Sequence, residues 1–181
     1  PIAQGESIKN QDLLKSMLVT SRNTPARMLA DSSSLSERSF IERMNETTKG
    51  WGLQRTHFSD VYGYDLHNQS TASDYLKLFT KTLNDPTIRS TAETTSFSYT
   101  EVTDRNGAPH HTGLHTNRLA RQNHQLYSVG PSKTGYLYES GHNLAQIVTR
   151  KEDGREFVVI TLGNPQFATR FSEPDRIITW T

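Results

Sequence analysis

The sequence has 181 residues, of which 33% are hydrophobic, and this length and composition suit one domain with its own core. Its 20 basic residues are scattered among 19 acidic ones, giving a net charge of +1, so no basic patch indicates a nucleic-acid partner. The absence of cysteine excludes disulfides and thiolate metal sites.

Helical patterns predominate from residue 1 to 95. Apolar residues recur at helical spacing from about Asp12, and this first helix is predicted to break at Ser21. A second helix begins near Pro25, because proline suits a first helical turn, so Ser21 and Asn23 fall on a tight connection between two helices. Two more helices are predicted, one capped by Ser34 with Glu37 and ending near Gly50, the other capped by Thr71 with Asp74 and stopped at 84–86.

Strand patterns predominate from residue 96 to 181. A short extended segment at 97–102 leads into a polar loop that reaches residue 115. Three strands are then predicted at 133–138, 143–150 and 156–163, with an Asp-Gly turn joining the last two, before a terminal helix that opens at 172–175. Helices followed by antiparallel strands and a closing helix predict a single α+β domain over residues 1–181.

The seven histidines raise the question of a metal site. The spacing of His111 and His115 would place two imidazoles on one helical face, but the segment around them does not have a helical pattern. It is predicted to be a loop without a carboxylate at ligand spacing. We therefore expect solvated loop histidines, no metal ion and no cofactor.

Lys133, Thr134 and Gly135 open the first predicted strand of the sheet. Lysine and threonine are common at the head of an exposed edge strand, and glycine can mark a bulge, so a purely structural interpretation exists. In a functional interpretation, the glycine lets a peptide lie against the strand, the threonine hydroxyl binds a carboxylate and the lysine places positive charge under a cleft. Ser21 and Asn23 could form the opposite wall, although short polar residues at a helix junction are commonly caps.

The Ser-x-Asn and Lys-Thr-Gly motifs together resemble the substrate cleft of the penicillin-recognising serine D-Ala-D-Ala carboxypeptidases. The resemblance covers nearly the whole chain, with Tyr64 and Ser73 as departures from the family signatures. It implies a β-lactamase/transpeptidase-like fold that is incomplete at its N-terminus. The segments that carry it, in order, are 5–14, 21–23, 40–45, 51–53, 56–58, 63–65, 70–74, 116–119, 133–135 and 141–144.

The resemblance implies roles for the residues of the two motifs. Lys133 and Ser21 would form a hydrogen-bonded link that passes a proton to the departing D-alanine. Asn23 would hold a substrate amide through its carboxamide.

Further roles follow from the resemblance along the predicted strand. Thr134 would bind the terminal carboxylate of the substrate with help from Arg170, which stands after the last strand. Gly135 would let the peptide approach the strand, and the N–H of Tyr136 would supply half of an oxyanion hole.

The nucleophile is the main departure from the family. The family acylates a serine in Ser-x-x-Lys, and no serine in this sequence is followed three residues later by lysine. Ser73 and Lys77 have the wrong spacing. We therefore expect a fragment that is inactive by itself, and an N-terminal segment or a second chain that completes the fold.

The function implied is that of a peptidoglycan-processing serine D-Ala-D-Ala carboxypeptidase, which forms an acyl-enzyme with stem peptides and is inhibited by β-lactams. Such a protein is periplasmic or otherwise extracytoplasmic, with membrane association at full length left open. Two alternatives stay open: a D-Ala-meso-diaminopimelate endopeptidase of the same family, and a non-catalytic relative that binds cell-wall peptides or a partner protein. A class A β-lactamase is disfavoured, because Arg22 replaces the usual aspartate and no Glu-x-x-Leu-Asn motif follows before Lys133.

Overall fold

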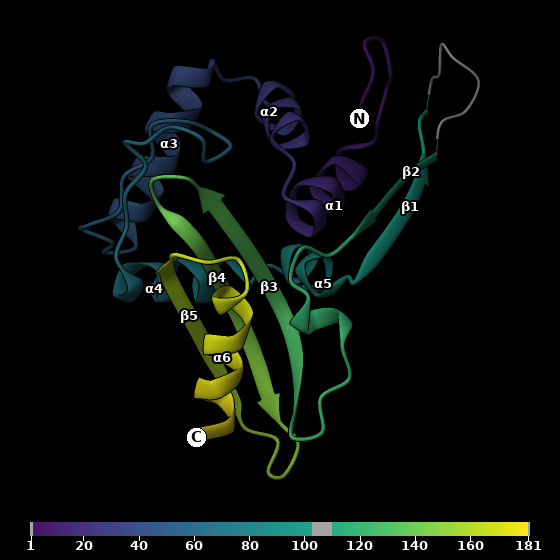
Figure 1. The fold of residues 1–181 in the computed structure, drawn as a ribbon. Helices are drawn as coiled ribbons and strands as arrows, with labels where there is room; N and C mark the ends of the chain where they lie inside the picture. The colour runs from purple at the N-terminus through teal and green to yellow at the C-terminus, as the bar shows by residue number, and fades with distance from the viewer. Residues whose placement is uncertain (1, 103–109, 181) are drawn as a thin grey trace.

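The computed structural model describes residues 2–102 and 110–180, and within them five helices precede the main sheet (Figure 1). These helices are α1 (Asn10–Thr20), α2 (Asn23–Asp31), α3 (Glu37–Gly50), α4 (Ala72–Thr82) and α5 (Pro86–Glu93). The main sheet contains β3 (Tyr127–Leu137), β4 (Gly141–Arg150) and β5 (Glu156–Asn164), which pair antiparallel in the order β3-β4-β5, and α6 (Thr169–Trp180) follows them. This arrangement confirms the predicted α+β fold class.

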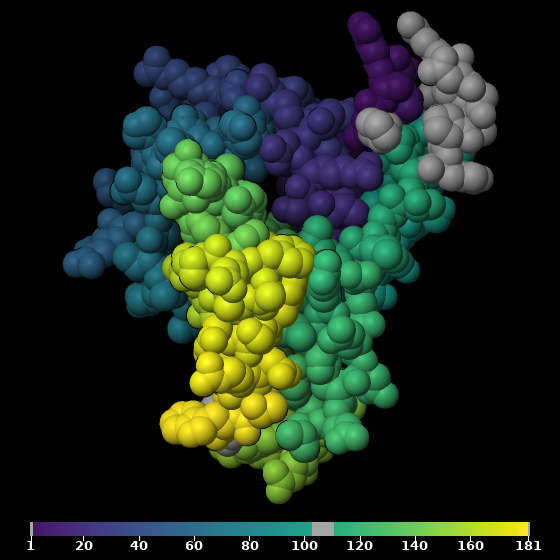
Figure 2. Space-filling view, in the orientation of Figure 1, coloured from purple at the N-terminus to yellow at the C-terminus, as the bar shows by residue number. Residues whose placement is uncertain are grey.

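The sheet is covered on both faces by helices because the side chains of its strands alternate between two cores. Ala145 and Ile147 of β4 pack against Phe79 of α4 and Ala92 of α5 on one face. On the other face, Val148 of β4 joins the core that contains Tyr127, Val159 and Ile178. Figure 2 shows α6 lying over the strands on this second face.

A separate two-stranded hairpin lies beside α1. It consists of β1 (Ser96–Thr100) and β2 (His110–Leu114), paired antiparallel with Tyr99 opposite His111. The prediction of a loop is therefore wrong over 110–114, and the prediction of solvated histidines is wrong for His111 and His115, which are 5% and 1% exposed. The rest of that predicted loop, 103–109, lies outside the described residues.

Helix α5 and the start of β3 differ from the sequence-based predictions. Helix α5 was not predicted, because Pro86 was interpreted only as a stop, whereas Asp85 accepts hydrogen bonds from the N–H groups of Thr87 and Ile88 and thus caps a new helix. Strand β3 begins six residues before Lys133, since the register shift between Val129 and Ser132 breaks the alternating pattern.

The remaining boundaries need smaller corrections. Ser36, not Ser34, caps α3 by accepting a hydrogen bond from the N–H of Ser39, while Thr71 caps α4 as predicted. Helix α6 begins before the predicted opening and contains Pro174 in its interior. A short 3-10 helix, η1 (Leu119–Arg121), precedes β3. Among the described residues, no helix is long and apolar enough to cross a membrane.

Candidate active-site cleft

The connection between α1 and α2 places Ser21 at the mouth of a cleft. Ser21 ends α1 with φ 55° and ψ 41°, and it is the one non-glycine residue with positive φ among those described. The left-handed conformation costs an L-residue roughly 1 kcal/mol, and such positions concentrate at functional sites. The sharp turn lets α2 begin at Asn23, so that both predicted polar residues lie on one short connection.

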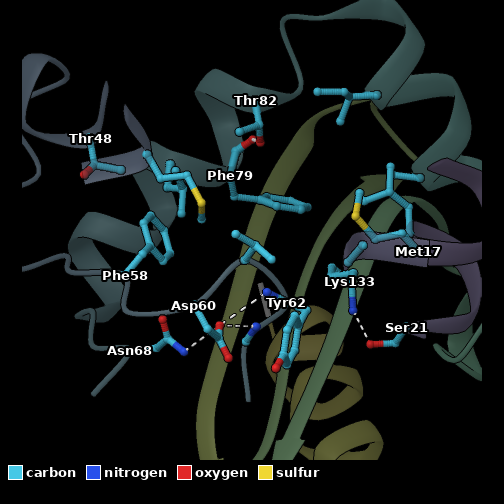
Figure 3. A pocket seen from close by; sticks show the side chains of 18 of the residues that line it. Met17, Ser21, Thr48, Phe58, Asp60, Tyr62, Asn68, Phe79, Thr82 and Lys133 are labelled. Carbon is cyan, nitrogen blue, oxygen red and sulfur yellow. Dashed lines mark hydrogen bonds between the residues drawn. The ribbon is translucent and has the colours of Figure 1, made fainter. Parts of the chain in front are cut away.

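Lys133 reaches Ser21 across the cleft from the sheet. Its Nζ donates one hydrogen bond to Ser21 Oγ at 2.5 Å (Figure 3). It donates another to the carbonyl oxygen of Thr134 at 2.7 Å. The two residues are 112 positions apart in sequence, so the fold brings together the pair that the sequence motifs nominated.

The electrostatic environment of Lys133 weakens its hold on a proton. Burial lowers the pKa of Lys133 to about 8, and the positive charge of Arg170 adds to this effect. An amine that titrates close to neutral pH can both take up and release a proton during a reaction.

Arg170 lies behind the strand that carries Lys133. It is 6% exposed, and its Nη1 donates a hydrogen bond to the carbonyl oxygen of Gly135 at 3.1 Å. Its guanidinium also lies over the rings of Phe167 and Phe171, at 5.0 and 5.1 Å from their centroids. Arg170 therefore lies beside the Lys-Thr-Gly strand and binds its backbone, and its Nε has no hydrogen-bond partner among the described residues.

Thr134, Gly135 and Tyr136 continue along the strand with different degrees of access. Thr134 is 4% exposed and its hydroxyl lies 2.7 Å from that of Thr116, whereas Tyr136 is 55% exposed and stacks on His142. A Cβ on Gly135 would make only an ordinary contact, 3.6 Å from Cβ of Asn143. The packing of the chain itself therefore does not require glycine at this position.

Asn23 faces the solvent from the first turn of α2. Its side chain is exposed and makes no hydrogen bond to another described residue, so the carboxamide is free to bind a ligand.

Two cavities meet at Lys133. The first, of about 730 Å³, is bordered by Ser21, Asn23 and Lys133 and has mainly apolar walls (Figure 3). The second, of about 710 Å³, follows β3 beyond Lys133 along Thr134, Gly135 and Tyr136. Helices α1 to α5 and the loop after α3 all contribute apolar side chains to the first cavity, among them Leu14, Met17, Met44, Phe58 and Phe79.

Asp60, which sequence analysis missed, organises the loop that borders both cavities. Its carboxylate accepts hydrogen bonds from the N–H groups of Gly63, Tyr64 and Asp65 at 2.6 to 2.7 Å, and from Asn68 Nδ2 at 3.0 Å. Burial acts to raise the pKa of Asp60, but these donors outweigh it and the pKa is lowered. The signal that could have revealed this role is an aspartate three residues before a glycine in a turn-rich segment.

A buried polar layer supports the strand from behind. The Nδ1 atom of His115 accepts a hydrogen bond from the N–H of Asn117, so Nε2 carries the proton and faces Ser132 Oγ at 3.4 Å. Asn117 Nδ2 donates to Gln146 Oε1 at 2.8 Å. Burial lowers the pKa of His115 to about 4, which keeps this imidazole neutral beside the lysine at pH 7.

Comparison with known proteins identifies relatives over most of the chain. The family model described as D-alanyl-D-alanine carboxypeptidase, peptidase S11, matches residues 1–166. The chain is 33% identical over 165 residues to a D-alanyl-D-alanine endopeptidase of Haemophilus influenzae, covering 91% of this chain and 54% of the relative. It is 29% identical to the D-alanyl-D-alanine carboxypeptidase DacC of Escherichia coli K12, covering 97% of this chain and 41% of the relative. The chain thus spans about half the length of the curated relatives it matches.

Solved structures share the fold. A mutant of the Streptomyces K15 DD-transpeptidase superposes with a TM-score of 0.88 at 25% identity, covering 99% of this chain and 70% of the other. A D-alanyl-D-alanine carboxypeptidase of Mycobacterium tuberculosis gives a TM-score of 0.84 at 21% identity, covering 99% of this chain and 66% of the other. Both support the transpeptidase-like architecture.

Proposed function

The chain belongs to the D-alanyl-D-alanine carboxypeptidase family, and on that premise we propose that its cleft binds the D-Ala-D-Ala end of a peptidoglycan stem peptide for acyl transfer to a serine. The contact between Lys133 Nζ and Ser21 Oγ, 2.5 Å long at the junction of two cavities, carries the proposal. A lysine with its pKa lowered to about 8 and linked to a hydroxyl forms a path for the proton that the leaving D-alanine must receive.

The remaining residues of the cleft position the peptide. Asn23 holds an amide of the substrate, Thr134 and Arg170 attract its terminal carboxylate, and Gly135 leaves room for its backbone beside β3. The N–H of Tyr136 stabilises the negative charge that develops on the carbonyl oxygen during acyl transfer. These assignments rest on the placement of the residues around Lys133 and on the family resemblance.

The reacting serine comes from outside these 181 residues in this proposal. The sequence contains no Ser-x-x-Lys. In the proposal, the segment or second chain that carries this motif binds in the apolar cavity beside Ser21 and Lys133. A buried apolar face on that segment would match the apolar walls of the cavity.

Fluorescent penicillin tests the proposal directly. The 181-residue chain alone should acquire no covalent label, whereas a longer chain that also carries an in-frame Ser-x-x-Lys should be labelled. In the longer chain, Lys133→Met should lower the labelling rate at least tenfold because the proton path is broken. Covalent labelling of the isolated chain, or an unimpaired Lys133→Met variant, would contradict the proposal.

An endopeptidase is the second candidate activity, supported by the 33% identity to the Haemophilus influenzae protein of that name. Product analysis separates the two with the longer chain as enzyme. Release of D-alanine alone from pentapeptide monomers supports a carboxypeptidase, and cleavage of cross-linked dimers supports an endopeptidase. A non-catalytic relative would bind the peptides and release neither product.

The proposed substrate also fixes the compartment. Stem peptides of peptidoglycan lie outside the cytoplasmic membrane, so the proposal places the protein in the periplasm or another extracytoplasmic space. Membrane association of the longer protein is a separate question that fractionation of cells would answer.

A further inference from the structure

Three side chains far apart in sequence meet beside the β1–β2 hairpin, away from the cleft. Glu6 lies in the segment before α1, Glu101 follows β1, and His111 lies in β2; their side chains are 3%, 0% and 5% exposed. His111 Nε2 lies 3.1 Å from Glu6 Oε2 and 2.6 Å from Glu101 Oε1. Figures 1 and 2 show the N-terminal segment beside this hairpin, and the N–H of Val102 donates a hydrogen bond to the carbonyl oxygen of Ser7.

The groups of the described residues alone leave this cluster unsatisfied. The Nε2 atom of His111 faces two carboxylates, but its geometry is that of a hydrogen bond only toward Glu6. Among the described residues, neither oxygen of the buried Glu101 has a hydrogen-bond partner. Among the described residues, no lysine or arginine forms an ion pair with either glutamate. A buried carboxylate without compensation is strongly destabilising, so the arrangement calls for another positive group.

We propose that Glu6, Glu101 and His111 bind a divalent metal ion, with Zn²⁺ the best match. The three ligand atoms lie within 4.8 Å of one another. Imidazole nitrogen and carboxylate oxygens are ligands that zinc accepts, and ligands of a tetrahedral zinc ion lie about 3.3 Å apart. Two carboxylates balance the charge of the ion, the Nε2 lone pair replaces the crowded N–H, and a fourth position stays open for water.

The imidazole is held in place before any ion binds. The ring of His111 stacks on Tyr99 with centroids 4.9 Å apart, and the hydroxyl of Tyr99 lies 3.1 Å from Ser16 Oγ in α1. A bound ion would therefore tie the N-terminal segment, the hairpin and α1 together, which is a structural role. The sequence prediction of no metal paired His111 only with His115 and left out Glu6, which lies 105 positions away in the sequence.

Titration of the metal-free chain with ZnCl₂ tests the site. After dialysis against a chelator, isothermal titration calorimetry should give one site per chain, and the melting temperature should rise with Zn²⁺ and fall again with EDTA. Glu101→Gln and His111→Gln should each weaken Zn²⁺ binding at least tenfold. His67→Ala provides the control, because His67 forms an exposed pair with Asp65 at 2.8 Å outside the cluster. This variant should bind Zn²⁺ with the affinity of the unmodified chain.

The melting temperature in EDTA shows whether a variant folds without the metal ion, so that a loss of Zn²⁺ binding is not mistaken for unfolding. Glu101→Gln removes a buried charge without changing shape, so in EDTA it should melt at or above the temperature of the unmodified chain. Absence of Zn²⁺ binding by the folded chain would overturn the proposal. So would a Zn²⁺ affinity of Glu101→Gln and His111→Gln that equals the affinity of the unmodified chain. Tighter binding of Ca²⁺ or Mg²⁺ than of Zn²⁺ would overturn the assignment of the ion.

Discussion

At the scale of single residues, the position of Lys133 beside Ser21 lowers the stability of the fold, because its amine is buried. Its pKa is about 8 in the folded chain, against an ordinary value of 10.5. The unfolded chain therefore binds more protons than the folded chain between these values, and the contribution of Lys133 to stability improves as the pH rises through this window. Below pH 8, the fold keeps a buried ammonium group, and the Ser21 and Thr134 oxygens offset part of its desolvation.

This pH dependence gives a prediction for Lys133→Met. Between pH 7 and pH 10, the free energy of unfolding of the unmodified chain should gain about 2–3 kcal/mol relative to the variant, because each unit of pKa difference is worth about 1.4 kcal/mol. Denaturant titrations of both proteins at the two pH values measure this difference. Lys77→Met, at an exposed position of α4, serves as the control and should show no comparable change. A pH-independent difference for Lys133→Met would contradict the buried, weakened amine.

At the scale of elements, two glycines of the main sheet differ in whether the fold itself requires them. At Gly141, which opens β4 with φ 63°, a Cβ would come within 2.8 Å of the carbonyl oxygen of Asn164. Backbone atoms cannot move aside as a flexible side chain can, so a substitution there strains the chain. Gly135 in β3 has ordinary φ and room for a Cβ, so any need for glycine there comes from a bound peptide.

Alanine substitutions should separate these two reasons. Gly141→Ala should lower the free energy of unfolding by about 1–3 kcal/mol. Gly135→Ala should leave stability within about 0.5 kcal/mol, yet slow penicillin labelling of the longer chain at least tenfold because the added methyl narrows the cavity along β3. Denaturant unfolding and labelling rates measure the two effects. Loss of stability in Gly135→Ala would show that the strand itself needs glycine.

The elements also show which parts of the fold the sequence could predict. Helices α1 to α4 carry apolar stripes, and Thr71 caps α4 as its spacing with Asp74 suggests. Helix α5 escaped notice because Pro86 marks both the end of one helix and the first turn of the next. The Ser21–Lys133 pair was predicted from its motifs, and Asp60 could have been found from its local spacing to Gly63. The contact between Glu6 and His111 joins residues 105 positions apart, which no local spacing encodes.

At the scale of the whole molecule, the sheet is closed on both faces by helices, but the junction between α1, α3 and α4 leaves the apolar cavity of about 730 Å³. Protein interiors are normally packed without voids of this size, and apolar hollows on a surface mark places where another group binds. The cavity adjoins Ser21 and Lys133, so whatever fills it also closes one side of the cleft.

A hydrophobic dye should therefore bind the isolated chain at this cavity. Anilinonaphthalene sulfonate fluorescence should rise on addition of the 181-residue chain, and Met17→Glu should reduce the rise severalfold because it places a negative charge on the cavity wall, which repels the sulfonate of the dye. Met28→Glu is the matched control, since Met28 lies in α2 outside the cavity lining. If the reacting serine arrives on a segment that occupies this cavity, the longer chain that carries Ser-x-x-Lys should bind the dye less than the isolated chain does. Equal dye binding by both chains would show that the segment carrying the reacting serine does not occupy this cavity. The serine would then have to approach Lys133 from the other side of β3.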